Sequence, residues 1–301
     1  MNNIKNLFSI KDLENISGIS AHAIRIWERR YKLFVPKRTE GNIRTYDIAD
    51  LQKLLNTVLL KQEGYKISRI AALSDEALFE EARNIVEQAF KKEYALLQLK
   101  IIMYKFDVRL FEEFYEKALS TYTFKEVFED IFLPFLHFVG LFWQTDTIKV
   151  AHEHFITNLI YQKIQLQIAH LEAISPDETK PTFILFLPEE EMHEIGLLYL
   201  NYELRLKGYP TIYLGRSIPL DDLNHLKPLF AKIYWVSTFT IIPEAKKLQS
   251  YFDKVNLFIE DKPYHFWAIG KQLESILKKP ISPNVTFFTS LKEAIERVRT
   301  L

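Results

Sequence analysis

The chain contains 301 residues, of which 48% are hydrophobic and 26% are charged, and its formal net charge is zero. This composition is typical of a folded protein with two or three domains, and it excludes collagen-like, low-complexity and disordered chains. The absence of cysteine excludes disulfides, thiolate metal sites and thiol catalysis. No run approaches the ~18 apolar residues of a membrane span, and the first residues lack the apolar core of a secretory signal. We therefore expect a cytoplasmic protein without a membrane partner.

The first 74 residues have the pattern of a small helical domain that contains a hairpin. Ser9 and Ser20 are the expected N-caps of its first two helices, and Gly18 fits the turn between them. Apolar Ile24, Trp27 and Tyr31 recur at helical spacing and should face the core. The expected elements are helices over 11–17, 21–31 and 47–62, a two-stranded wing over 34–46 and a short helix after Ser68.

Local charge, rather than the net charge of zero, is informative in this domain. Between His22 and Arg44 there are seven basic residues and two acidic ones. A helix pair followed by a basic hairpin suits DNA, because the second helix can enter the major groove while cations around the hairpin neutralise phosphates. A solvated basic face on a small helical domain is the alternative. The basic residues are Arg25, Arg29, Arg30, Lys32, Lys37, Arg38 and Arg44.

The run IRIWERRYKLFVPKRTEGNIRTY resembles the winged helix-turn-helix of MerR-superfamily transcription regulators, in particular the pattern R-x-W-E-x-R-Y-G-L-x-x-P-x-R. Lys32 stands where this pattern has glycine. The resemblance implies a homodimer, or a ligand-induced tetramer, on palindromic double-stranded DNA. It implies that Ala21, His22 and Arg25 lie near bases, that Arg29, Arg38, Arg44 and Tyr46 lie near phosphates, and that Arg30 and Lys37 belong to the same DNA-binding surface.

The rest of the chain changes pattern once, near a polar linker at 174–181. Before it, the helical period predicts a bundle of about four helices whose phenylalanine stripe is mostly core. After it, nearly continuous apolar strands alternate with helical segments, which predicts a doubly wound five-stranded parallel sheet. We expect a winged helix-turn-helix at 1–74, a helical bundle at 75–173 and a Rossmann-like, flavodoxin-like α/β domain at 180–301. Strands are expected at 183–187, 211–214, 233–237, 265–269 and 285–289, and helices at 193–207, 220–230, 243–258, 271–277 and 290–298.

The most informative motif follows the first expected strand, at the edge where doubly wound sheets bind ligands. There Glu191, His193 and Gly196 form E-x-H-x-x-G. A neutral imidazole is a good donor to cobalt, and a carboxylate on its other ring nitrogen raises its basicity. A histidine without function, exposed on a surface loop, is the alternative interpretation.

This motif resembles the D-x-H-x-x-G loop of cobalamin-binding domains in which a histidine replaces the corrin's own base beneath cobalt. The resemblance implies adenosylcobalamin or methylcobalamin as cofactor and His193 as the cobalt ligand. Ser237 matches the family's serine that contacts the buried nucleotide tail. Gly270 is the remaining member of the family's glycine pair, and Phe239 stands where leucine is usual.

A second motif lies in the expected bundle, where Trp143 is followed after nine residues by Glu153 and His154. It resembles the W-x(9)-E-H signature of cobalamin-binding regulators. The resemblance implies that Trp143 caps the upper corrin face and that Glu153 and His154 line the same cavity. A core tryptophan beside a surface pair is the alternative. Gln144 stands where light-sensing members have a cobalt-capturing histidine, which favours ligand sensing; His152 or His154 could replace that histidine only in a favourable geometry.

Together these features predict a sequence-specific DNA-binding regulator, not an enzyme, whose DNA binding or oligomerisation is controlled by cobalamin between bundle and sheet. One alternative is a MerR-type regulator that keeps the fold but no longer binds cobalamin. Another is a corrinoid carrier for methyl transfer. The sequence contains no zinc-protease, phosphate-loop or nucleophile-elbow motif, so those enzyme classes have no support.

Overall fold

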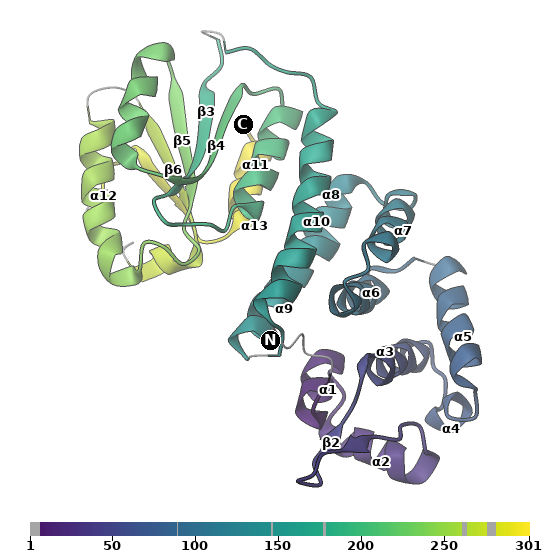
Figure 1. The fold of residues 1–301 in the computed structure, drawn as a ribbon. Coiled ribbons are helices and arrows are strands. Elements are labelled where there is room, and N and C mark those ends of the chain that lie inside the picture. The colour runs from purple at the N-terminus through teal and green to yellow at the C-terminus, as the bar shows by residue number, and fades with distance from the viewer. Residues whose placement is uncertain (1–6, 89, 146, 177–178, 261–263, 276–280) are drawn as a thin grey trace. The chain divides into compact units, whose positions relative to one another are not determined.

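The computed structural model describes residues 7–88, 90–145, 147–176, 179–260, 264–275 and 281–301 (Figure 1). The chain forms two compact units, Met1–Ile160 and Tyr161–Leu301. Within the described ranges, no helix combines the length and the apolar character that crossing a membrane requires.

The first helix of the first unit has both ends set by local sequence. Helix α1 (Ile10–Ser17) begins with a capping box, in which Ser9 and Asp12 each accept a hydrogen bond from the other's backbone N–H. Gly18 ends the helix in the left-handed region, at φ 74°. The expected helix, its N-cap and its terminating glycine are confirmed.

Helix α2 (Ala21–Tyr31) begins at the expected N-cap, Ser20, and ends on an unusual residue. Lys32 lies in the left-handed region at φ 57°, and its N–H donates to the Glu28 carbonyl. This is the position where the MerR pattern has glycine, which reaches positive φ without a Cβ clash. Lys32 therefore adopts a conformation in which a residue with a Cβ is strained.

A small hairpin and three helices follow. The expected wing is present as β1 (Lys37–Arg38) paired antiparallel with β2 (Arg44–Thr45). Asp47 caps the next helix with a capping box, and Gly64 adopts φ 86° after that helix ends. The helices are α3 (Ile48–Gln62), α4 (Ile67–Ile70) and α5 (Asp75–Gln88).

The next helices form the expected bundle, and their phenylalanines supply much of its core. Phe128, Phe132, Phe135 and Phe142 are buried, as the sequence predicts. One turn of π-helix, η1, joins α8 and α9 into a continuous helical run. The elements are α6 (Lys92–Lys105), α7 (Val108–Leu119), α8 (Phe124–Val127), η1 (Phe128–Phe132), α9 (Leu133–Gln144) and α10 (Val150–Ala169).

The second unit is built on a five-stranded parallel sheet with the strand order β4-β3-β5-β6-β7. This is the predicted doubly wound topology, and each strand overlaps its expected range. Strand β4 extends past its expected end because its irregular pairing with β3 continues to Pro188. The strands are β3 (Thr182–Pro188), β4 (Thr211–Ile218), β5 (Ile233–Thr238), β6 (His265–Ile269) and β7 (Val285–Phe288).

Helices cover both faces of the sheet (Figure 1). Helices α11 (Ile195–Leu206) and α13 (Leu291–Arg299) lie on one face, and α12 (Ala245–Ile259) lies on the other. Two expected α-helices are instead 3-10 helices, η2 (Leu220–Leu229) and η3 (Lys271–Ser275). Pro228 explains part of this difference, because it lacks the N–H that an α-helix needs. The expected end of the second, at Leu277, lies outside the described residues.

Candidate functional site

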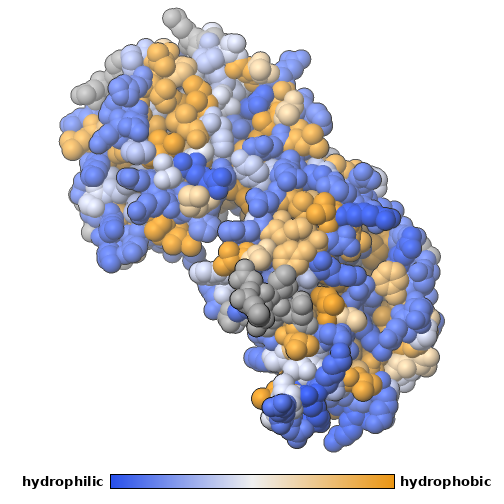
Figure 2. All heavy atoms as spheres, in the orientation of Figure 1, coloured by the Kyte–Doolittle hydropathy of each residue, from blue (hydrophilic) through white to orange (hydrophobic). Residues whose placement is uncertain are grey.

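Helix α2 separates a buried apolar stripe from an exposed basic face. Ile24 and Trp27 are buried on the inner side, and Ala21 at the first turn is half-buried. Figure 2 shows hydrophilic residues gathered over α2 and the wing, at the lower end of the view. The exposed residues of the helix that the sequence predicted to bind DNA are His22, Arg25, Arg29 and Arg30.

Glu28 joins α2 to the wing. Its carboxylate is 8% exposed; Oε2 accepts from Nε of Arg44 at 3.1 Å, and Oε1 accepts from the hydroxyl of Tyr46. Tyr46 is fully buried, and burial together with Glu28 raises the pKa of its hydroxyl. A buried hydroxyl bonded in this way does not reach a phosphate. The expected phosphate contact of Tyr46 is therefore replaced by a supporting role, in which Tyr46 orients Glu28 and Glu28 orients Arg44.

Two cations of the wing, Lys37 and Arg38, are exposed and have partners close in sequence or space. Arg38 Nη1 donates to the side-chain oxygen of Asn42 at 2.7 Å and to its carbonyl at 3.2 Å. Lys37 lies 3.5 Å from a carboxylate oxygen of Asp47. These contacts restrain the two cations within the wing, and the ion pair of Arg44 with Glu28 links the wing to α2.

Trp143 lies in the last turn of α9 and is 52% exposed, so it is not the core residue of the alternative interpretation. Leu141 and Val150 beside this corner are also exposed. In α10, Glu153 is half-buried and His154 is exposed. A large aromatic side chain that is exposed in this way is available to contact a ligand or partner.

His152 has a packing role. The side chain is 1% exposed, and its ring lies 5.2 Å from that of Tyr104 and 4.8 Å from that of Phe106. Its Nδ1 accepts the backbone N–H of Lys149. This buried imidazole is not placed to replace the histidine that light-sensing members have at the position of Gln144.

Glu191 follows β3 and bonds to two separate backbone segments. Its Oε1 accepts from the N–H groups of Met192 and His193 and lies 2.6 Å from Nδ1 of His193. Its Oε2 accepts from the N–H groups of residues 240–242, which follow β5, at 2.8 to 3.2 Å. The carboxylate, which is fully buried, thus joins two loops at the carboxyl edge of the sheet.

These bonds keep the carboxyl group of Glu191 ionised. Burial acts to raise the pKa of Glu191, but the hydrogen bonds from His193 and from backbone N–H groups outweigh it and lower the pKa to about 2. The ionised carboxylate favours a proton on Nδ1 of His193, so Nε2 is the ring nitrogen through which this imidazole would bind a metal. Because the His193 side chain is 46% exposed, the loop presents an imidazole in the form that binds metals.

The same loop is held from its other side by β4. Glu194 accepts from the hydroxyl of Tyr213 and from Nε of Arg216, both at 2.9 Å. The N–H of Glu190 donates to Oγ of Ser217. Glu190 and Ser217 both have positive φ, 68° and 57°. Strained backbone at paired loops is frequent at functional sites, where neighbouring contacts keep one conformation.

The other two predicted contacts lie where β5 and β6 end. Oγ of Ser237 and Oγ1 of Thr238 are buried and have no hydrogen-bond partner among the described residues. Buried hydroxyls of this kind normally have a partner, so they mark a place for a polar group. A Cβ at Gly270 would lie 2.2 Å from the carbonyl oxygen of Phe239, so this position requires glycine. Phe239 itself is buried in the core.

The sequence interpretation missed the residues that hold the predicted ones in place. No pattern marks the N–H groups of 240–242 as partners of Glu191, because the contact joins two distant loops. The burial of Glu28 could have been predicted, because Glu28 follows Trp27 and lies four residues after Ile24, on the buried side of the helix. Gly196 lies in the first turn of α11, where a Cβ would meet the side chain of Leu291 at an ordinary 3.4 Å.

Comparison with known proteins agrees with this organisation. Residues 8–77 match the family described as MerR HTH family regulatory protein, and residues 95–166 match the family described as B12 binding domain. The chain is 26% identical over 247 residues to the HTH-type transcriptional repressor CarH of Myxococcus xanthus, covering 77% of this chain and 79% of the relative. It is 28% identical over 220 residues to the repressor CarA of the same organism, covering 71% and 70%.

A solved structure supports the fold. The Methanosarcina barkeri monomethylamine corrinoid protein aligns with a TM-score of 0.57 and 13% identity, over 70% of this chain and 100% of that chain. Both curated relatives are named as transcriptional repressors, which confirms the prediction of a regulator rather than an enzyme. The chain is therefore similar to MerR HTH regulatory proteins over residues 8–77 and to B12 binding domains over residues 95–166.

Proposed function

We propose that this protein is a sequence-specific DNA-binding regulator whose DNA binding or oligomerisation is controlled by cobalamin. The observation that carries the proposal is the Glu191–His193 pair, in which a buried carboxylate 2.6 Å from Nδ1 sets the metal-binding form of an exposed imidazole. A surface histidine without function would not need six hydrogen bonds to orient its partner. The expected division into domains at 1–74, 75–173 and 180–301 is kept as part of the proposal.

The residues of the second unit fit a corrinoid. His193 would ligate cobalt through Nε2, and Glu191 would hold the ring's orientation and its proton on Nδ1. The buried hydroxyls of Ser237 and Thr238 would receive polar atoms of the nucleotide tail, near the position that requires Gly270. When bound, the corrinoid supplies a cobalt centre with an exchangeable upper ligand, which we propose to be adenosyl or methyl.

Residues of the first unit are suited to the upper face of the corrin ring. Trp143 is 52% exposed, so its indole is available to cover a flat ring. Glu153 and His154 are the polar residues proposed to line the same cavity. A ligand can shift an assembly only by its difference in affinity between two states, so regulation requires that cobalamin favour one arrangement of the protein.

The DNA contacts proposed here follow the exposed cations of α2 and the wing. The expected partner is a palindromic operator bound by a homodimer or tetramer, in the cytoplasm. Ala21, His22 and Arg25 are proposed to face bases, and Arg29 and Arg38 to face phosphates. Arg30, Lys37 and Arg44 complete the basic surface, with Arg44 supported by Glu28.

The test mixes full-length protein with adenosylcobalamin or methylcobalamin and follows co-elution and the absorbance spectrum of the corrinoid. We expect the wild type to co-elute with a histidine-ligated spectrum, and His193→Ala to lose that spectrum while binding duplex DNA as the cobalamin-free wild type does. His225→Ala, at an exposed histidine of the same unit, is the matched control. An unchanged corrinoid spectrum in His193→Ala would contradict the assignment of the ligand.

A regulator that keeps the fold without cobalamin is the second candidate. The close approach of Gly270 to Phe239 favours it, because the protein's own backbone occupies the space that the glycine provides. Under this hypothesis neither corrinoid co-elutes with the wild type, and Phe239→Leu does not restore binding. Co-elution with a histidine-ligated spectrum would exclude it.

A further inference from the structure

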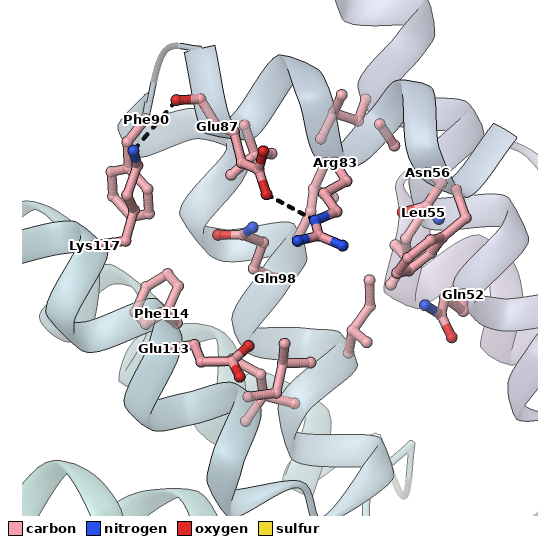
Figure 3. A pocket seen from close by; sticks show the side chains of 18 of the residues that line it. Gln52, Leu55, Asn56, Arg83, Glu87, Phe90, Gln98, Glu113, Phe114 and Lys117 are labelled. Carbon is pink, nitrogen blue, oxygen red and sulfur yellow. Dashed lines mark hydrogen bonds and ion pairs between the residues drawn. The ribbon is translucent and has the colours of Figure 1, made fainter. Parts of the chain in front are cut away.

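A cavity of about 500 Å³ lies within the first unit, between α3, α5, α6 and α7 (Figure 3). Its volume is in the range of small-molecule sites in proteins. It is separate from every residue assigned above to DNA or to cobalamin. Most of its wall is apolar, including Leu55 and Leu59 of α3, Ala82 and Val86 of α5, and Leu97 and Ile101 of α6.

One polar side chain stands out in this apolar wall. Gln98 of α6 lies in the middle of the cavity view, between the labelled residues of α5 and α7 (Figure 3). Its Oε1 is buried and has no hydrogen-bond partner among the described residues. A buried amide oxygen without a donor is unfavourable, so the site favours a molecule that brings one.

The charged residues at the rim already have partners. Arg83 forms an ion pair with Glu87 at 2.7 Å, and Arg109 forms one with Glu113 at 2.9 Å. Lys117 donates to the backbone carbonyl of Glu87. Each carboxylate is paired with a guanidinium, and the ammonium of Lys117 already donates to a backbone carbonyl, so the charged rim groups have partners within the protein and a neutral ligand fits best.

We propose that this cavity binds a neutral, largely apolar small molecule that carries one hydroxyl or amide N–H group, which donates to Oε1 of Gln98. The apolar body lies against the aliphatic walls of α3, α5 and α6. Since α3 belongs to the DNA-binding domain and α6 and α7 to the bundle, such a ligand would hold the two parts of the first unit together. The proposal does not depend on cobalamin binding.

The test uses the full-length chain and three probes that share an eight-carbon body: 1-octanol, its methyl ether and octanoate. Saturable binding is measured by calorimetry and by the shift in melting temperature. We expect 1-octanol to bind about tenfold more tightly than the ether, which has no donor, and more tightly than octanoate. Equal binding of alcohol and ether, tighter binding of octanoate, or no saturable binding would each overturn the proposal.

Two variants locate the site. Gln98→Leu should reduce octanol affinity to that of the ether and leave the ether's affinity unchanged. Ala82→Phe should fill the cavity and abolish binding of all three probes, whereas Ala77→Phe, on the exposed side of the same helix, should not. If Ala82→Phe disturbs folding by circular dichroism, Gln98→Leu alone decides, because it replaces one side chain of similar size. Unchanged octanol binding in Gln98→Leu would overturn the proposal.

Discussion

Lys100 of α6 donates a hydrogen bond from Nζ to the carbonyl oxygen of Ile16, 2.7 Å away, in the last turn of α1. The same Nζ lies 4.0 Å from the ring centroid of Phe138 in α9. One side chain therefore connects the DNA-binding domain with the helix that carries Trp143. A second link joins Asn15 of α1 to Thr147, which lies between α9 and α10.

The half-buried Lys100 predicts a stability that depends on pH. Burial lowers the pKa of Lys100 to about 8, from 10.5 in an ordinary lysine. Between these values the unfolded chain binds more protons than the folded one, so stability should rise as the pH increases from 8 toward 10.5. Relative to Lys100→Met, the free energy of unfolding of the wild type, measured in urea, should rise by up to about 3 kcal/mol between pH 8 and pH 10.5. Lys105→Met, at an exposed lysine of the same helix, should show no such gain.

Replacing Lys32 by glycine should stabilise the first unit. Lys32 pays the Cβ penalty of the left-handed region at φ 57°, on the order of 1 kcal/mol. Lys32→Gly removes that penalty and should raise the free energy of unfolding by about 0.5–1 kcal/mol, since glycine also gains entropy in the unfolded chain. Lys32→Ala keeps the Cβ and separates the effect of charge. A destabilised glycine variant would mean that the lysine side chain contributes more than its backbone costs.

The buried carboxylate of Glu191 predicts a loss of stability in acid. Its pKa of about 2 lies below the ordinary 4.5, so its contribution is complete above pH 4.5 and is lost as the pH falls toward 2. The contribution is on the order of 3 kcal/mol. In urea unfolding, the difference between wild type and Glu191→Gln should shrink as the pH falls from 5 to 3. The exposed neighbour Glu190→Gln is the control, and a pH-independent difference for Glu191→Gln would refute the argument.

Tyr46 and Arg29 should separate a supporting residue from a phosphate contact. Arg29→Ala should reduce the slope of log affinity against log salt by about one on a random-sequence duplex, because one fewer counterion is released. Tyr46→Phe should leave that slope unchanged and lower the free energy of unfolding by about 1–2 kcal/mol, since it leaves Oε1 of Glu28 without its hydroxyl donor. A lower slope of log affinity against log salt in Tyr46→Phe would indicate that Tyr46 contacts a phosphate, as the sequence predicts.

The sequence predicted what depends on local spacing. Ser9, Gly18 and Ser20 set helix ends through their nearest neighbours, and the strands of the second unit appear as short apolar runs, so both were recognised. It did not predict η2 and η3 as 3-10 helices; Pro228, which lacks an N–H, accounts for part of the difference in η2, and no local signal accounts for η3. The burial of His152 also depends on Tyr104, on a different helix, and no local pattern contains that contact.

In the candidate site, too, residues with local spacing were predicted and residues that depend on distant contacts were not. Glu191 and His193 were recognised because their spacing is local, and the structure places them in contact. Their common support, the N–H groups of residues 240–242, follows a different strand and depends on the order of strands in the sheet. Tyr46 was misplaced for a similar reason, since its burial results from contact with Glu28 of another element.

The exposure of Trp143 gives the protein an internal optical reporter. The chain has four tryptophans, and the other three, Trp27, Trp235 and Trp267, are at most 7% exposed. A water-soluble quencher such as acrylamide will therefore act mainly on Trp143. If a ligand covers Trp143, acrylamide should quench the fluorescence less after the ligand is added than before. Quenching would therefore report binding at the end of α9 without an added label.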